Sequence, residues 1–417
     1  MKSADFSLRR RREARWFKSV VLNAVCLLSC PVALADTASF IPVPVNPAQQ
    51  LQLPPGFVAT VFAQVPGAGS SMFRGPRFMT FGPDGSLYLS LGFDNKVVML
   101  PDRNRDGRAD EIVTVAEKLN APQGLAFVEG HLLVANQDGI VRLEDRDGQW
   151  PASKVIPVIS GLPAGGHTLK SLKLGPDGFL YLNIGSSCNV CEENDPNRAT
   201  LLRYRPDGMP AGAIPSVGRH PTSPIWATGL RNSQGFAWEP KTGAMFATND
   251  GADMRSTQKA GAANDDIPPE HLNRIEAGHH YGWPHCWGAR FNDPNFPGPA
   301  GFCDGMTPPE LTFPAHATPI GMSFLDKTTF PADYRGDALV ALHGSWNREN
   351  PAGYKVVRVH FTQGKPVSFS DFVTGWLLDG KAWGRPTDIA VGPDGAVYIS
   401  DDRAGLIYRI IYRKEAP

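Results

Sequence analysis

His167 is the residue whose type and setting best suit acid–base chemistry. It follows two glycines in the segment GGHTLK (165–170), a context typical of an exposed loop. An imidazole titrates near neutral pH and can act as a general base. We interpret His167 as a candidate base, the alternative being a structural histidine. Short segments elsewhere in the chain carry further charged or amide side chains, namely Arg74, Arg77, Gln123, Lys170, Arg231, Asn232, Gln234, His316, Arg385 and Asp388.

This set is rich in cations. Several like charges around one cavity are unfavourable unless an anion or carboxylates neutralise them. If the fold brings the set together, the residues predict a site for an anionic ligand or cofactor. The alternative is that these side chains only form hydrogen bonds between neighbouring parts of the fold.

Acidic residues gather in the segment TNDGADMRSTQKAGAANDDIPPEHLN (248–273). Carboxylates and backbone carbonyls at this density suit calcium, although a solvated acidic loop would have the same composition. The segment DRNRDGRADE (102–111) also imitates a calcium loop, but Val113 stands where such a loop needs glutamate. A turn between strands is the alternative there. The oxygen-bearing residues of the longer segment are Asn249, Asp250, Asp253, Asp265, Asp266, Glu270 and Asn273.

Residues 1–35 have the pattern of an export signal, with a basic stretch, a short apolar stretch and ALA before Asp36. An uncut N-terminal anchor is the alternative. Removing the seven Lys/Arg and two Asp/Glu of this segment leaves 34 basic and 39 acidic residues, a net charge of −5. A mildly acidic exported protein is a poor candidate for nucleic-acid binding. No apolar run is long enough for a membrane span.

Four cysteines follow this segment, and an even number in an exported chain indicates disulfides. We favour the pairs Cys188–Cys191 and Cys286–Cys303, because each lies within one loop-rich stretch. The CNVC motif is also compatible with a redox pair or half of a zinc site.

A repeated phrase indicates the elements that must position these residues. It reads MTFGPDGSLYLSLG at 79–92, LKLGPDGFLYLNIG at 172–185 and IAVGPDGAVYISDD at 389–402. Alternating apolar residues around a glycine-containing turn predict a β-hairpin. Weaker copies at 124–139, 235–251 and 321–344 bring the number to six. A lone hairpin cannot bury its apolar face, whereas four-stranded units of this spacing stack into a propeller.

The sequence therefore predicts an all-β, six-bladed β-propeller with four-stranded antiparallel blades, formed by residues 36–417 as one domain. We expect a long insertion at 251–320, between blades four and five. The charged segments listed above each precede a hairpin. Equivalent positions of a propeller face one axial cavity, so we expect these side chains to converge there.

Four further stretches carry a family resemblance: GLRNSQG (229–235), DDIPPEHLNRIEAGHHYGWP (265–284), ALHGSWNR (341–348) and IGSSCNVCEE (184–193). With them the chain resembles the soluble pyrroloquinoline-quinone (PQQ)-dependent sugar dehydrogenases, and within them the L-sorbosone dehydrogenase-like branch. The resemblance implies a propeller that binds PQQ and calcium at the top of its channel. It also implies that His167 is the general base, that Arg231 and Asn232 lie beside the cofactor, and that Gln123 contacts it.

The same resemblance implies further site residues. Arg385 matches the first of two arginines that hold cofactor carboxylates, while Thr387 replaces the second. His343, Arg348 and Asp388 complete the expected cofactor site. Gly251 and Ala252 align with backbone carbonyls that hold a catalytic calcium. The acidic residues that follow, Asp253, Asp265, Asp266 and Glu270, resemble a second, structural calcium site.

The activity implied is oxidation of a sugar or sugar-aldehyde hydroxyl by hydride transfer to PQQ. Electrons would pass to an external acceptor, a cytochrome or quinone, since the chain has no haem motif. We expect a periplasmic or secreted monomer or homodimer, cleaved after Ala35. The alternatives are a calcium-dependent propeller lactonase or other hydrolase, and a non-catalytic carbohydrate-binding propeller.

Overall fold

The computed structural model describes residues 40–66, 74–146, 149–214 and 222–413. Residues Asp36–Pro417 form one compact unit. The export signal predicted for residues 1–35, with its cleavage site, lies outside the described residues. Within the ranges described, no helix is long and apolar enough to cross a membrane.

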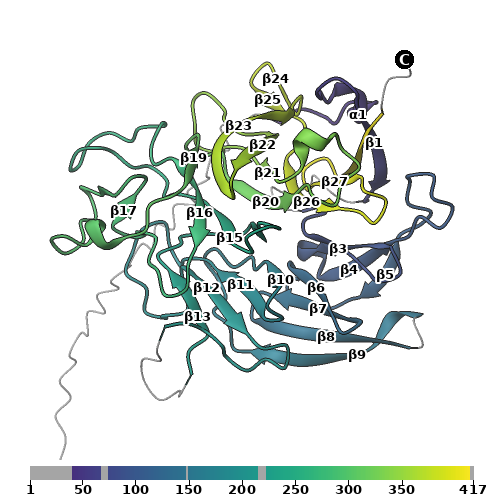
Figure 1. The fold of residues 1–417 in the computed structure, drawn as a ribbon, viewed down its shortest axis with the longest axis horizontal. Coiled ribbons are helices and arrows are strands. Elements are labelled where there is room, and N and C mark those ends of the chain that lie inside the picture. Colours follow the sequence, from purple (N-terminus) through teal and green to yellow (C-terminus); the bar gives the residue numbers. More distant parts are fainter. Residues whose placement is uncertain (1–39, 67–73, 147–148, 215–221, 414–417) are drawn as a thin grey trace, which may run out of the picture. The chain divides into compact units, whose positions relative to one another are not determined.

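The described chain is almost entirely β-structure, arranged as six four-stranded antiparallel sheets (Figure 1). This confirms the predicted six-bladed propeller. Blade one is β2 (Met79–Phe81), β3 (Leu87–Leu91), β4 (Lys96–Leu100) and β5 (Val113–Ala116). Blade two is β6 (Leu125–Val128), β7 (His131–Asn136), β8 (Gly139–Arg146) and β9 (Gln149–Ser160). Blade three is β10 (Leu172–Leu174), β11 (Leu180–Ile184), β12 (Thr200–Tyr204) and β13 (Ile225–Thr228).

Blade four is β14 (Phe236–Trp238), β15 (Met245–Asn249), β16 (Glu270–Ile275) and β19 (Leu311–Phe313). Blade five is β20 (Pro319–Phe324), β21 (Ala338–Leu342), β22 (Lys355–Thr362) and β23 (Lys365–Val373). Blade six is β26 (Pro386–Val391), β27 (Val397–Asp401), β28 (Leu406–Tyr412) and β1 (Phe57–Gln64). Short elements outside the blades are α1 (Pro47–Gln50), β17 (Cys286–Trp287), β18 (Phe291–Asn292), β24 (Leu377–Leu378) and β25 (Lys381–Ala382).

Blade six joins the two ends of the described chain. β1 pairs with β28 along most of its length, from Phe57 opposite Tyr412 to Gln64 opposite Leu406. The outer strand of this blade therefore comes from the beginning of the described chain and the other three strands from its end. This pairing closes the ring and covers what would otherwise be an exposed strand edge.

Each of the six predicted hairpins forms the first two strands of a blade. The Gly-Pro-Asp-Gly turn works as its chemistry predicts. In blade three, Gly178 has φ +80°, which favours glycine, and the Asp177 carboxylate accepts a hydrogen bond from the Phe179 amide. Neighbouring blades approach closely at their first strands. A Cβ on Gly235, just before β14, would lie 1.5 Å from the Ile320 carbonyl oxygen of β20.

The insertion expected at 251–320 differs from the prediction. Two strands of blade four, β16 and β19, lie within this range, so the extra residues interrupt blade four instead of separating blades four and five. The alternation of β16 is hard to recognise because polar side chains of this strand are buried. One of them, His271, accepts a hydrogen bond from the Gly288 amide through Nε2. The predicted Cys286–Cys303 disulfide is present in the longer loop, 276–310.

Candidate active site

A cavity of about 320 Å³ lies where the segments preceding the hairpins meet. Five of the six segments contribute to it, which confirms the predicted convergence for those of their residues that line the cavity. Arg74, Gln123, Lys170 and Asp388 were also expected there, but they do not line the cavity. The contributing residues are Arg77 of blade one, His167 of blade three, Arg231, Asn232 and Gln234 of blade four, His316 of blade five and Arg385 of blade six. The other lining residues are Phe93, Gly166, Thr168, Leu169, Asp250, Gly251, Asp253, Glu270, Thr318, Ile320, His343 and Trp346.

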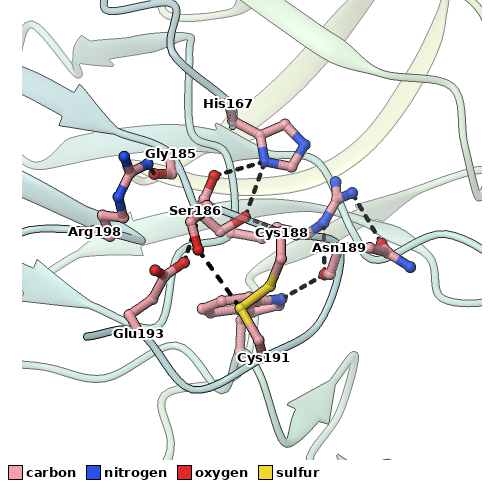
Figure 2. The surroundings of a disulfide bond; sticks show 11 residues. His167, Gly185, Ser186, Cys188, Asn189, Cys191, Glu193 and Arg198 are labelled. Atoms are coloured by element: carbon pink, nitrogen blue, oxygen red, sulfur yellow. Dashed lines mark hydrogen bonds between the residues drawn. A yellow bond between two sulfur atoms is a disulfide. The ribbon is translucent and has the colours of Figure 1, made fainter. Parts of the chain in front are cut away.

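His167 presents an unprotonated ring nitrogen to this cavity. Its Nδ1 lies 3.1 Å from the Ser186 carbonyl oxygen and 2.9 Å from the Ser186 Oγ (Figure 2). A carbonyl only accepts, so Nδ1 carries the proton and Nε2 carries the lone pair. Burial, and then the charge of Arg231, lower the pKa of His167 to about 4. The imidazole is therefore neutral at pH 7 and can accept a proton at Nε2.

Arg231 is buried but neutralised. Its Nη2 donates to Asp253 Oδ2 at 3.0 Å. The other oxygen of Asp253 accepts from Asn347 Nδ2 at 2.8 Å and lies 3.5 Å from His316 Nδ1. The Asp253 carboxylate is thus engaged by neighbouring side chains on both oxygens. This argues against its predicted role as a metal ligand.

Arg385 is buried, and no carboxylate of the described residues forms a salt bridge with it. Only 2% of it is exposed, and its Nε and Nη2 donate to the carbonyl oxygens of His343 and Gly344. Its Nη1 is buried with no hydrogen-bond partner among the described residues. A buried guanidinium with an unused donor is unfavourable unless an anion binds there. Arg385 therefore marks the part of the cavity that best suits an anionic ligand.

Arg77, Asp402 and His343 form a second charged group on the cavity wall. Arg77 forms a buried salt bridge with Asp402, and His343 Nε2 lies 2.9 Å from Asp402 Oδ1. Burial raises the pKa of Asp402, but His343 and Arg77 outweigh it and lower that pKa overall. Asp402 was not foreseen from the sequence. The sequence feature that could have pointed to it is the pair of consecutive aspartates, Asp401 and Asp402, at the end of the last predicted hairpin.

Two buried carboxyl groups, those of Asp250 and Glu270, line the same cavity as the arginines. Burial raises the pKa of Asp250 to about 7, and burial together with Asp250 raises that of Glu270 to about 8. Asp250 Oδ2 accepts from Asn232 Nδ2 at 3.0 Å, and Glu270 accepts from the Gly251 amide. Asp250 Oδ1 and Asn232 Oδ1 are buried without a partner in the part of the chain described. These unused oxygens are the ligand type that calcium prefers.

Some predicted calcium ligands lie elsewhere. Ala252 does not line this cavity. Asp265 Oδ2 accepts from the Glu349 amide at 2.7 Å, and exposed Asp266 pairs with Arg348 at 2.9 Å. The predicted grouping of Asp265 and Asp266 with Glu270 is therefore not assembled, because the two aspartates anchor the loop that follows β21 instead.

Among the described residues, the only group of three possible metal ligands that lie close together is Cys188, Cys191 and Glu193. Its cysteines form the predicted Cys188–Cys191 disulfide, so they are not available as thiolates. The zinc alternative for CNVC is wrong.

Three predicted cofactor contacts do not line the cavity. Arg348 donates hydrogen bonds to the backbone carbonyls of Asp265 and Ala315 and to the carboxylate of Asp266. Asp388 accepts from the Met79 amide at 2.9 Å and thereby joins blade six to blade one. Gln123 is buried, and neither atom of its amide has a partner within the described ranges. Thr387, at the position of the missing arginine, is also buried and donates to the Arg385 carbonyl.

These features define a class of protein: a six-bladed β-propeller whose axial cavity combines a neutral base, an unpaired guanidinium and a buried carboxyl pair. The chain belongs to the TrAA12-like family, whose model matches residues 71–413.

The chain is also similar to named proteins. The PQQ-dependent pyranose dehydrogenase of Coprinopsis cinerea is 26% identical over 288 residues, which cover 57% of this chain and 38% of that protein. Its PQQ domain in the holo form superposes with a TM-score of 0.71 at 20% identity, covering 89% of this chain and 98% of that one. A calcium structure of Trichoderma reesei Carbohydrate-Active Enzymes Family AA12 gives a TM-score of 0.72 at 19% identity, covering 87% and 97%.

Proposed function

We propose that this protein is a PQQ-dependent sugar dehydrogenase that oxidises a sugar or sugar-aldehyde hydroxyl. The family, the C. cinerea relative with its holo structure, and the calcium structure from T. reesei support the proposal. The chain spans 38% of the length of that relative. An L-sorbosone-like substrate is the finer proposal, from the sequence resemblance.

Arg385 carries the proposal. PQQ is a polyanion, and Arg385 offers a buried, unpaired guanidinium edge in the same cavity as His167. A charge-assisted hydrogen bond from this edge to a carboxylate would satisfy the donor and neutralise the charge. Arg77 and Arg231 line the same cavity and already have carboxylate partners. Arg385 is therefore the residue that we expect to hold the cofactor.

Calcium would fit beside the buried carboxyl groups that line the same cavity. Asp250 and Glu270 supply carboxylates, and the unused oxygens of Asp250 and Asn232 supply further ligand atoms. Gly251 also lines the cavity, and we expect its carbonyl to be a further calcium ligand.

His167 and Arg231 would lie beside both the substrate and the cofactor. His167 would accept the hydroxyl proton at Nε2, while its Nδ1–H stays hydrogen-bonded to Ser186. Arg231, held by Asp253, would stabilise negative charge that develops in the cavity. When bound, PQQ would supply the hydride acceptor and calcium a Lewis acid.

A hydrolase is the second candidate, because Asp250, Glu270 and Asn232 form an acidic and amide wall such as a calcium-dependent lactonase needs. Arg385 has no evident use in that chemistry. The test is to purify the protein, add PQQ with calcium, and record the visible absorption spectrum and dye reduction by aldoses and sorbosone. Spectral change with dye reduction supports the dehydrogenase. Opening of lactones with calcium alone would replace it.

We further infer that the protein is exported, since both predicted disulfides form in the structure and such bonds persist in oxidising compartments. Mass spectrometry of the protein from its native host would test cleavage after Ala35. A chain that still begins at Met1 would contradict it.

A further inference from the structure

The Cys188–Cys191 disulfide closes a four-residue turn directly beside the cavity. The turn lies in the connection between β11 and β12, and Figure 2 shows it next to His167, Ser186 and Asn189. This connection is hydrogen-bonded to the candidate base. Ser186 Oγ accepts a hydrogen bond from His167 Nδ1 and donates one to the Cys188 carbonyl at 2.7 Å. The disulfide is thus two hydrogen bonds away from the candidate base.

Asn189, between the two cysteines, holds Arg231. Its carbonyl oxygen accepts from Arg231 Nε at 3.1 Å, and its Oδ1 accepts from Arg231 Nη2 at 3.0 Å. The second hydrogen of Nη2 goes to Asp253. Three of the five guanidinium hydrogens are therefore fixed, and the two on Nη1 are left for the cavity that Arg231 lines.

The same asparagine holds the neighbours of Arg231. Its Oδ1 also accepts from the Asp253 amide at 2.8 Å, and its Nδ2 donates to the Asp253 carbonyl at 2.9 Å. Its carbonyl further accepts from Trp283 Nε1 at 3.1 Å, in the loop that contains the other disulfide. One exposed residue thus fixes a buried guanidinium together with the backbone of the aspartate that neutralises it.

We propose that Asn189 is a positioning residue that aims Arg231 into the cavity, and that the Cys188–Cys191 disulfide keeps Asn189 in place. An exposed turn outside the strands has many accessible conformations, and a cross-link removes most of them. This inference rests on the proposed function, because it assigns Arg231 to the cofactor and substrate cavity.

The test is a double-mutant cycle on PQQ binding. The affinity for PQQ is measured by the quenching of tryptophan fluorescence with calcium present. Arg231→Ala and Asn189→Ala should each weaken PQQ binding, Asn189→Ala by about three- to tenfold. If Asn189 acts through Arg231, the double variant should bind no more weakly than Arg231→Ala alone. Cys188→Ala/Cys191→Ala should weaken binding to a similar extent as Asn189→Ala. Asn194→Ala, an exposed asparagine of the same connection, is the matched control and should bind PQQ normally.

Three results would overturn the inference. Normal PQQ binding by Asn189→Ala, or fully additive losses in the double variant, would show that Asn189 does not act through Arg231. Normal binding by the cysteine variant would remove the disulfide from the role. If the unaltered protein binds no PQQ, the proposed function fails together with this inference. If it binds PQQ and Arg231→Ala weakens binding, the function stands and only Asn189 is in question.

Discussion

The carboxylate of Asp253 accepts a hydrogen bond from Arg231 Nη2 at 3.0 Å, so this buried cation is neutralised before any ligand binds. Arg385 lines the same cavity, and its Nη1 has no hydrogen-bond partner in the part of the chain that the structure describes. The two arginines therefore have different roles. Arg231 has a fixed orientation and a carboxylate partner, whereas we expect Arg385 to gain a charged hydrogen-bond partner when the proposed anionic cofactor binds.

Replacing Arg385 by methionine should weaken PQQ binding about 10- to 100-fold, because the lost interaction is a hydrogen bond to a charged group in a buried site. Fluorescence quenching by PQQ, with calcium present, measures the change. Arg103→Met is the matched control, since Arg103 pairs with Asp110 and Glu111 on the surface. Equal affinity of the Arg385→Met variant and the unaltered protein would show that the anion binds elsewhere.

Replacing His167 by alanine should lower turnover about 10²- to 10⁴-fold and leave PQQ bound, because the variant lacks the proton acceptor but keeps the cationic wall. Dye reduction under saturating sugar and PQQ measures it. The exposed residue His131, at the start of β7, supplies the control variant His131→Ala. Near-normal turnover of His167→Ala would remove His167 from the role of base.

The buried carboxyl pair predicts how stability depends on pH without calcium. The pKa values of Asp250 and Glu270 are raised in the folded protein, so these groups stay protonated where the unfolded chain has lost the protons. The folded state then binds more protons, and the free energy of unfolding falls as pH rises toward about 8. Buried His167 and His343, with pKa values lowered to about 4, act in the opposite direction, but only below about pH 6.5.

The measurement is the thermal midpoint between pH 6.5 and 8, with and without calcium. Without calcium the midpoint should fall across this range, and added calcium should raise it more at pH 8 than at pH 6.5, because the metal competes with protons. Asp250→Asn should flatten the first slope and reduce the calcium effect. A calcium effect that is the same at both pH values would argue that this pair is not the metal site.

The two disulfides should differ in their contribution to stability. The cysteines of the Cys286–Cys303 disulfide are 17 positions apart in the sequence, and those of Cys188–Cys191 only 3. Loop closure predicts a loss of about 3 kcal/mol for removing the first and about 2 kcal/mol for the second. Chemical denaturation of the two double-alanine variants measures these losses. Greater destabilisation by the Cys188→Ala/Cys191→Ala variant would show that loop length does not govern the difference.

Much of the fold could be predicted from the sequence because each hairpin is local. The alternation and the Gly-Pro-Asp-Gly turn need only neighbouring residues, and Gly178 adopts the positive φ that the turn requires. The pairing of β1 with β28 could not be seen, since it joins residues more than 340 positions apart and has no local signal. β16 was missed because the burial of its polar residues hides the alternation.

For the site, the residues that precede each hairpin could be identified from the sequence, and the repeat was enough to predict that His167, Arg231 and Arg385 share one cavity. Which of the charged groups already have partners could be known only from the folded structure. Asp253 proved to be the partner of Arg231, Asp402 that of Arg77, and Asp388 a support between blades. The physical reason is that the charge state and the free donors of a buried group depend on atoms within a few ångströms. Those atoms come from residues distant in the sequence, and for Arg77 and Met79 from another blade.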